Sequence, residues 1–78
     1  MKLGKQEMHE RLRWLREYYG YSQKQISEFL EISQPYYSMI EKGARPFKST
    51  EKMEKLANLY CCSLGFLIGR ENEFHPLM

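Results

Sequence analysis

The chain has 78 residues, 42% hydrophobic and 28% charged, with a formal net charge of +2; this describes one small globular domain rather than a disordered chain. So weak a net charge means that a nucleic-acid surface would need local clusters of Lys and Arg. No apolar run approaches the ~20 residues of a membrane span, and the N-terminal MKLGKQEMHERLRW lacks the apolar core of a secretory signal, so we expect a cytoplasmic protein.

The first predicted helix runs from about Lys5 or Met8 to Tyr19. Its apolar residues recur at helical spacing and form one face: Met8, Leu12, Leu15 and Tyr19. Gly20 follows, and glycine tolerates the left-handed conformation common at helix ends. We therefore expect this helix to stop at Gly20.

The second predicted helix, residues 22–30, opens with a capping box. Ser22 can accept a hydrogen bond from the amide three residues on, and Gln25 can reach back to the amide of Ser22. Ile26 and Leu30 are expected to face inward. Only a tight turn, closed by Ile32, separates this helix from the next one.

The third predicted helix lies within ISQPYYSMIEKG, residues 32–43. Ser33 caps it, Pro35 occupies the first turn, where a missing amide is harmless, and Gly43 ends it. Two short helices joined by a tight turn make a helix-turn-helix, whose second helix fits the major groove of DNA. Tyr37 and Ile40 are expected to face the core, and the residues expected to face away from it are Gln34, Tyr36 and Met39. This asymmetry favours DNA reading over catalysis.

After a loop that holds Pro46, Ser49 caps a fourth helix, with Glu51 well placed near its N-terminus. Its expected inner face is Met53, Leu56, Ala57 and Tyr60. Ser63 opens a short fifth helix, LGFLI, which Gly69 ends. The predicted fold is all-α: one compact five-helix bundle with its core in residues 8–69 and a C-terminal tail, 70–78, without a pattern of its own.

Several segments occur in a specific order: RLRWLRE, YSQKQISEFLEIS, SMIEKG, and EKLANLY followed by SLGFLIG. Through them the chain resembles the Cro-repressor/XRE-type helix-turn-helix family over residues 11–69. The resemblance implies a lambda-repressor-like DNA-binding domain that acts as a transcriptional regulator, most simply a repressor. It further implies a homodimer on an inverted repeat of double-stranded DNA, read by recognition helix 33–42. Because the sequence holds no cofactor motif, we expect no cofactor.

The resemblance assigns the base contacts to the outward residues of the recognition helix: Gln34, Pro35, Tyr36 and Met39. Gln34 could pair bidentately with an adenine edge, while Tyr36 and Met39 could touch a thymine methyl group. Two alternatives stay open. Tyr36 could instead pack on Pro35 or Phe47, and Met39 could belong partly to the core.

The phosphate contacts that the resemblance implies are Gln23, Lys24, Ser38, Lys42, Arg45 and Lys48. Gln23 opens the second helix, where its amide and the helix N-terminus can hold a phosphate. Lys42, Arg45 and Lys48 belong to the end of the recognition helix and the loop after it, and the matching loop in the family follows the DNA backbone. The alternative for the cations is an ordinary solvated surface, and for Ser38 a hydrogen bond back to its own helix.

The resemblance also pairs Arg16 of the first helix with Glu41 near the end of the third. A bidentate, partly buried ion pair there would hold the recognition helix on the scaffold, so both residues are structural rather than DNA ligands. The chain departs from the family pattern at the turn, where Glu31 stands in place of the common Gly. A left-handed backbone at Glu31 would cost about 1 kcal/mol or more.

Trp14, Tyr18 and Phe29 fall off the main apolar faces. Two explanations are open for these aromatics. They could form a dimer surface together with Phe66, Leu67, Phe74 and Leu77, or the tail could fold over Trp14. An alternative function follows from the first: a protein-interaction module, such as an antitoxin or adaptor, whose exposed aromatics hold a protein partner.

Catalysis and metal binding find no support in the residue pattern. The chain has no Asp, and His9 and His75 have ordinary neighbours. Cys61 and Cys62 are adjacent, and no second pair completes a zinc site. We expect a protein that is not an enzyme and binds no metal.

Overall fold

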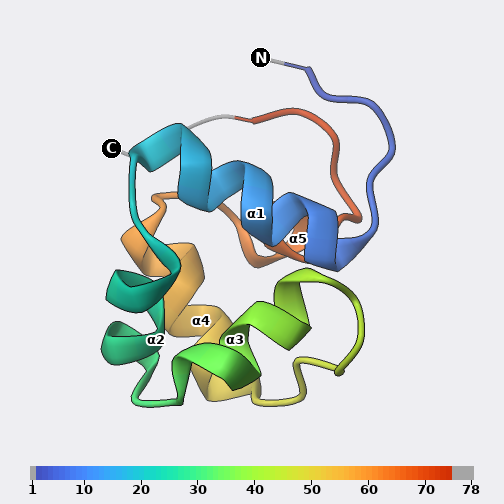
Figure 1. The fold of residues 1–78 in the computed structure, drawn as a ribbon. Helices are drawn as coiled ribbons and strands as arrows, with labels where there is room; N and C mark the ends of the chain where they lie inside the picture. The colour runs from blue at the N-terminus through green and yellow to red at the C-terminus, as the bar shows by residue number, and fades with distance from the viewer. Residues whose placement is uncertain (1, 75–78) are drawn as a thin grey trace.

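The computed structural model describes residues 2–74. In chain order its helices are α1 (Met8–Tyr19), α2 (Gln23–Leu30), α3 (Gln34–Glu41), α4 (Thr50–Leu59) and α5 (Leu64–Leu67) (Figure 1). Within this described range, the extended pairing is limited to one isolated antiparallel bridge between Lys2 and Glu73. The predicted all-α fold of five helices is therefore confirmed.

Helix boundaries follow local capping signals. Ser22, Ser33, Ser49 and Ser63 each accept a hydrogen bond from the backbone amide three residues on. The capping box at α2 is complete, because Gln25 Oε1 also accepts from the Ser22 amide at 2.9 Å. The start of α1 at Met8 was among those expected, but its capping box between Glu7 and Glu10 was not anticipated. Each box satisfies amides that the first turn of a helix leaves unpaired.

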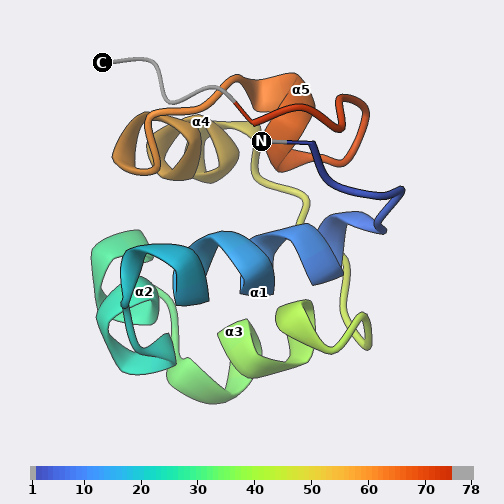
Figure 2. The same cartoon turned by 90° about the horizontal axis from the view of Figure 1, so that it is seen from above.

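The central helix is α1. Figure 2 shows α1 with α3 on one side and α4 and α5 on the other, and α1 packs directly against α3 and α5. The helix-turn-helix of α2 and α3 thus forms one face of the molecule. The N-terminal segment and the tail lie near α5 (Figures 1 and 2).

The buried core draws side chains from every helix. Its members, each at most 5% exposed, are Leu12, Leu15, Ile26, Leu30, Tyr37, Ile40, Leu56, Ala57, Tyr60, Cys62, Phe66, Leu67 and Phe74. Met8, Tyr19 and Met53 were also predicted to face inward, but they are only partly buried and pack against this core. Met8 and Tyr19 are the first and last residues of α1.

The tail packs over Trp14 as far as the structure describes it. The Phe74 ring meets Trp14 edge-on at 5.6 Å and Tyr18 at 5.2 Å between ring centroids. Phe66, Leu67 and Phe74 are buried inside the chain, so the suggested dimer surface built from them is wrong. Leu77 and His75 lie outside the described residues. Tyr18 keeps 49% exposure and stacks on Trp14.

A buried arginine that sequence reasoning missed joins the two ends of the chain. Arg11 is 0% exposed, and its guanidinium donates to the carbonyl oxygens of Phe66 and Glu71, each at 2.8 Å. It also donates to Gln6 Oε1 at 2.6 Å and lies 4.1 Å from the centre of the Phe66 ring. Burial lowers the pKa of Arg11. These contacts tie the N-terminal segment and the tail to α1, on the side of α1 that carries α5.

Candidate nucleic-acid interface

The turn between α2 and α3 is tight and left-handed. Glu31 has φ 59° and ψ 41°, which is the conformation that the expected Gly would adopt without strain. The amide of Ile32 donates to the Ser27 carbonyl at 3.0 Å and closes the turn. Leu30 before the turn and Tyr37 after it are both buried. The two helices are therefore held together by the turn and by shared core packing.

One side of α3 is buried and the other faces solvent. Tyr37 and Ile40 are at most 1% exposed, whereas Met39 is 42% exposed. Gln34 and Pro35 are exposed as well, and Ser38 is half-buried. Met39 is therefore not part of the core. The structure brings the residues proposed for base contact to accessible positions along one short helix.

Tyr36 lies at the edge of this exposed face. It is 38% exposed and lines a shallow cavity of about 290 Å³ together with Ile32, Phe47 and Lys48. Tyr36 and Phe47 therefore lie on the same cavity, and packing of Tyr36 on Phe47 or Pro35 stays a prediction. Lys52, in the first turn of α4, lines the same cavity and was not singled out from the sequence.

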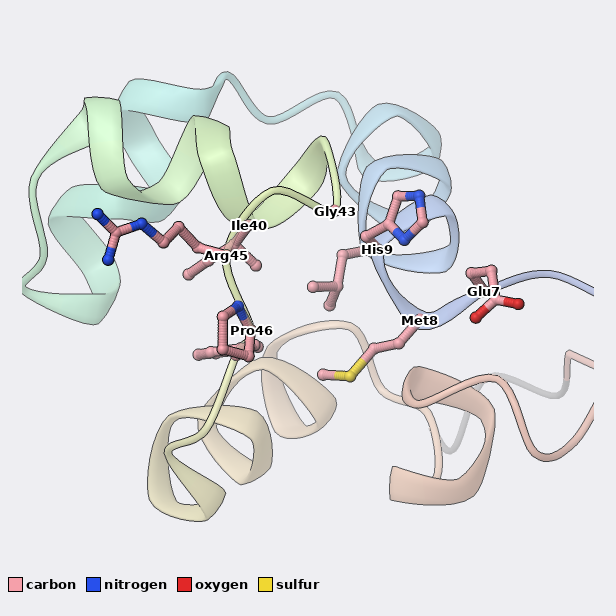
Figure 3. Close-up of a pocket in the computed structure, with 9 residues that line it drawn as sticks. Glu7, Met8, His9, Ile40, Gly43, Arg45 and Pro46 are labelled. Atoms are coloured by element: carbon pink, nitrogen blue, oxygen red, sulfur yellow. The ribbon is translucent and has the colours of Figure 1, made fainter.

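The cations expected to meet phosphates lie around the helix-turn-helix. Lys24, Lys42, Arg45 and Lys48 are all exposed. Lys42 caps the C-terminus of α3, and Arg45 and Lys48 follow in the loop to α4. The Arg45 side chain extends away from Met8 and His9 of α1 (Figure 3). Positive side chains thus follow α3 from its C-terminus into the loop, and Lys24 adds a further charge at the start of α2.

An ion pair on the buried side of α3 fixes this helix to α1. Arg16 Nε donates to Glu41 Oε2 at 2.7 Å, and Arg16 Nη2 donates to Glu41 Oε1 at 3.1 Å. The side chains are 13% and 2% exposed, respectively. Burial alone would raise the pKa of Glu41, but the interactions of its carboxylate with Arg16, Tyr37 and Gln23 outweigh burial and lower the pKa. The pair links α1 to the end of α3, as the sequence resemblance implied.

A family model described as a helix-turn-helix domain matches residues 7–65, which covers all of α1 to α4. The chain belongs to the helix-turn-helix domain family, in its XRE/Cro-like clan. Among curated proteins, no match to the chain was found.

Gln23 of this helix-turn-helix domain makes an inward contact in the free protein. Its Nε2 donates inward to Glu41 Oε1 at 3.1 Å, and the side chain is partly buried. In the free protein the amide is therefore engaged with the ion pair rather than presented to solvent. Sequence reasoning missed this contact because Gln23 and Glu41 belong to different helices.

The helix-turn-helix domain also has a cavity of about 400 Å³ between the start of α1 and the loop after α3 (Figure 3). Its lining residues are Glu7, Met8, His9, Leu12, Ile40, Gly43, Arg45, Pro46 and Phe47. The His9 ring lies against Gly43, where a Cβ would come within 3.1 Å of it. Gly43 also has φ 78°, so both space and backbone conformation require glycine there. His9 serves packing at this position.

No group of three or more His, Cys, Asp or Glu side chains within residues 2–74 could hold a metal ion. None of the helices found there is long and apolar enough to cross a membrane. Burial raises the pKa of Cys62 to about 11, which keeps its thiol protonated.

Proposed function

We propose that this helix-turn-helix domain is a sequence-specific DNA-binding transcriptional regulator, acting as a repressor through recognition helix 33–42. The main support is the two-sided construction of α3: Glu41 is locked to Arg16 on the buried side, while Gln34 and Met39 are accessible on the other. A rigid helix that presents exposed polar and apolar side chains suits base-edge recognition. Without a catalytic arrangement, binding at a promoter and blocking of polymerase is the simplest mechanism.

The position of each residue on or around α3 determines whether we assign it to base contact or to phosphate contact. Gln34, Pro35 and Met39, with Tyr36 at the edge, would read bases. Phosphates would be held by the exposed cations Lys24, Lys42, Arg45 and Lys48 and by two half-buried polar residues, Gln23 and Ser38. Phosphate contacts supply affinity that weakens with salt, whereas base contacts supply specificity.

In vitro selection from random duplexes at about 150 mM salt would test this proposal, because non-specific phosphate binding is weakened there. We expect enrichment of an inverted repeat. The matched control is Gln34→Ala, which should relax the enriched sequence at one or two positions in each half-site. A folded wild-type protein that enriches no sequence would contradict the proposal.

We propose a homodimer, because operators of this kind place half-sites about 10–10.5 bp apart on one face of DNA. The buried Phe66, Leu67 and Phe74 are not available for its interface. Tyr18 on α1 and Leu64 on α5 remain exposed at 49% and 36% and are the better candidates. Sedimentation of the protein on an inverted-repeat duplex should give two chains per duplex, and one chain at tens of micromolar protein would argue against a dimer.

The alternative function is a protein-interaction module, such as an antitoxin or adaptor, and exposed aromatics favour it. Phe29 on α2 is 39% exposed although Lys55 lies 4.9 Å from its ring centre. The Trp14 ring packs against Phe74 of the same chain, so a change there would also disturb the fold. Tyr18→Ala and Phe29→Ala change exposed side chains and therefore test this function better. Loss of a co-purifying protein with unchanged DNA affinity would support it.

We further propose that the domain is not an enzyme and works in the cytoplasm. The two cysteines are unpaired, as a reducing compartment would keep them. The His9 ring packs on Gly43, and the Cys62 thiol is buried, so neither is set up as a catalytic base or nucleophile. A hydrolytic or transfer activity that co-purifies with the protein and disappears in a His9→Gln variant would contradict this proposal.

A further inference from the structure

Three helices meet around a small polar cavity of about 220 Å³ beside the helix-turn-helix. Its lining residues are Arg13, Arg16, Gln23, Glu41 and Lys42. The two arginines belong to α1, Gln23 is the first residue of α2, and Lys42 caps the C-terminus of α3. Gln23 and Lys42 are among the phosphate contacts proposed above, whereas Arg13 has no part in that proposal.

The charges around this cavity favour an anion. Its lining holds three cations against one carboxylate, that of Glu41. The Glu41 side chain is 2% exposed and accepts two hydrogen bonds from Arg16, at 2.7 and 3.1 Å. Because Arg16 and Glu41 neutralise each other in the wall, the charges of Arg13 and Lys42 remain uncompensated within the lining.

Arg13 keeps donors for a further acceptor. Its Nε donates to Glu17 Oε2 at 3.3 Å, and the side chains of this pair are 65% and 56% exposed. So exposed a pair contributes little and holds the arginine only weakly, because water screens both charges. The bond from Nε also leaves both Nη atoms of the guanidinium for another acceptor. Arg13 can therefore bind an anion without giving up Glu17.

Gln23 adds a neutral donor that the ion pair holds in place. Its Nε2 donates to Glu41 Oε1 at 3.1 Å, and this bond uses one of the two hydrogens of the amide nitrogen. The residue lines the cavity and is only partly buried. An anion in the cavity can accept the second hydrogen while the bond to Glu41 stays intact.

We propose that this cavity is a binding site for one phosphate of the DNA backbone, and that Arg13 is a phosphate contact within it. Arg13 reaches this phosphate from α1, Gln23 from α2 and Lys42 from the end of α3. One phosphate then contacts all three helices and fixes the helix-turn-helix and its scaffold on the duplex together. The site adds affinity and register rather than base preference, since phosphates carry no sequence information. This inference rests on the DNA-binding function proposed above.

Arg13→Gln tests the site, and Arg70→Gln is the matched control. Both substitutions remove one charge from an exposed arginine. Arg70 lies beside α5, where its amide donates to the Gly65 carbonyl at 2.8 Å, and Figure 2 shows α5 on the other side of α1 from α3. Arg13→Gln should weaken binding to the selected duplex roughly three- to tenfold at about 150 mM salt and reduce the slope of log affinity against log salt by about 1.

Arg70→Gln should change the affinity less than about twofold and leave the salt slope as in the wild-type protein. Equal effects of the two substitutions would overturn the site, because net charge alone would then explain them. Arg13→Lys keeps the charge and should bind more tightly than Arg13→Gln. The urea midpoint of Arg13→Gln should equal that of the wild-type protein, since the pair with Glu17 is exposed on both sides.

Duplexes with one methylphosphonate in each half-site locate the phosphate, because this group is neutral. The methylphosphonate is moved along the backbone one position at a time. At one position the wild-type protein should lose affinity, and neither Arg13→Gln nor Lys42→Gln should lose more there, because the partner of both residues is already neutral. Masking of the two variants at different positions would overturn the shared site.

The same experiments separate this site from the function on which it rests. A folded wild-type protein that binds no duplex would refute the proposed function itself. Tight wild-type binding that Arg13→Gln leaves unchanged would refute the site alone. A loss in Arg13→Gln that no methylphosphonate masks would also refute it, because Arg13 would then act on the duplex only at long range.

Discussion

Arg16 and Glu41 connect the scaffold to the recognition helix through two hydrogen bonds, Nε to Oε2 at 2.7 Å and Nη2 to Oε1 at 3.1 Å. Arg16 Nη1 also donates to the Tyr21 carbonyl at 2.9 Å. One guanidinium thus holds the end of α1, the start of the α1–α2 connection and the end of α3. The orientation of α3 is therefore tied to α1 by charge and geometry together.

Replacing Arg16 by Met should destabilise the domain strongly, because Glu41 would be left as a nearly buried charge without its main partner. We expect a loss of about 3–5 kcal/mol in the free energy of unfolding, measured by urea titration at pH 7. Arg13→Met is the control, since its pair with Glu17 is exposed on both sides; it should change stability by less than about 0.5 kcal/mol. Similar effects of the two substitutions would refute the buried-pair argument.

The same pair makes stability depend on pH in the acid range. The pKa of Glu41 is lower in the folded protein than its ordinary value of 4.5, so the pair stabilises the fold fully above that value. This stabilisation should be lost as pH falls below 4.5 through the folded pKa. Thermal melts from pH 7 to 3 should show wild type and Glu41→Gln converging at low pH. A constant difference across the range would contradict the assignment.

Base contacts and phosphate contacts should separate experimentally. Gln34→Ala should reduce the discrimination between bases by about 1–3 kcal/mol at one or two base pairs. The salt dependence of its DNA affinity should stay close to that of the wild-type protein. Arg45→Ala should weaken binding to all sequences and reduce the slope of log affinity against log salt by about 1. Binding isotherms on the operator and on single-base variants, at several salt concentrations, measure both. An Arg45→Ala variant that changes base preference alone would reverse our assignment.

Glu31 holds the turn of the helix-turn-helix in a left-handed conformation, with φ 59°. Glu31→Gly should therefore stabilise the domain by up to about 1 kcal/mol, because glycine adopts this conformation without a Cβ penalty. Glu31→Ala, which removes the carboxylate but keeps Cβ, is the control and should give no such gain. Urea unfolding separates the two, and a loss of stability in Glu31→Gly would show that the side chain matters more than the backbone.

The adjacent cysteines should differ in reactivity. Cys61 is partly exposed, while Cys62 is buried and its pKa is raised to about 11. A thiolate is the reactive form, so iodoacetamide at pH 8 should modify Cys61 first in the native protein and both residues after unfolding. Peptide mass spectrometry measures the extent of modification. The Cys61→Ser variant is the control, because only Cys62 can then be modified. Rapid modification of native Cys62 would contradict its burial.

Much of the local architecture could be predicted because its causes are local. Serine caps, the Gly20 stop and the apolar spacing of α1 act within one or two helical turns, and each has the predicted place in the structure. The tight turn before Ser33 identified the helix-turn-helix for the same reason. Once α3 was predicted, the inward positions of Tyr37 and Ile40 determined which of its other side chains would face solvent.

Contacts between distant segments were decided only by the tertiary structure. Burial of Arg11 depends on carbonyl groups some 55 residues later in the chain, and the packing of Phe74 on Trp14 depends on the path of the tail. The inward hydrogen bond of Gln23 arises where α1, α2 and α3 meet. Helix periodicity and capping determine which face of a helix is apolar, but not which polar groups meet when several faces pack together. For this domain, the residues proposed to read DNA and the Arg16–Glu41 pair could be expected from the sequence, whereas the contact of Gln23 with that pair and the burial of Arg11 required the fold.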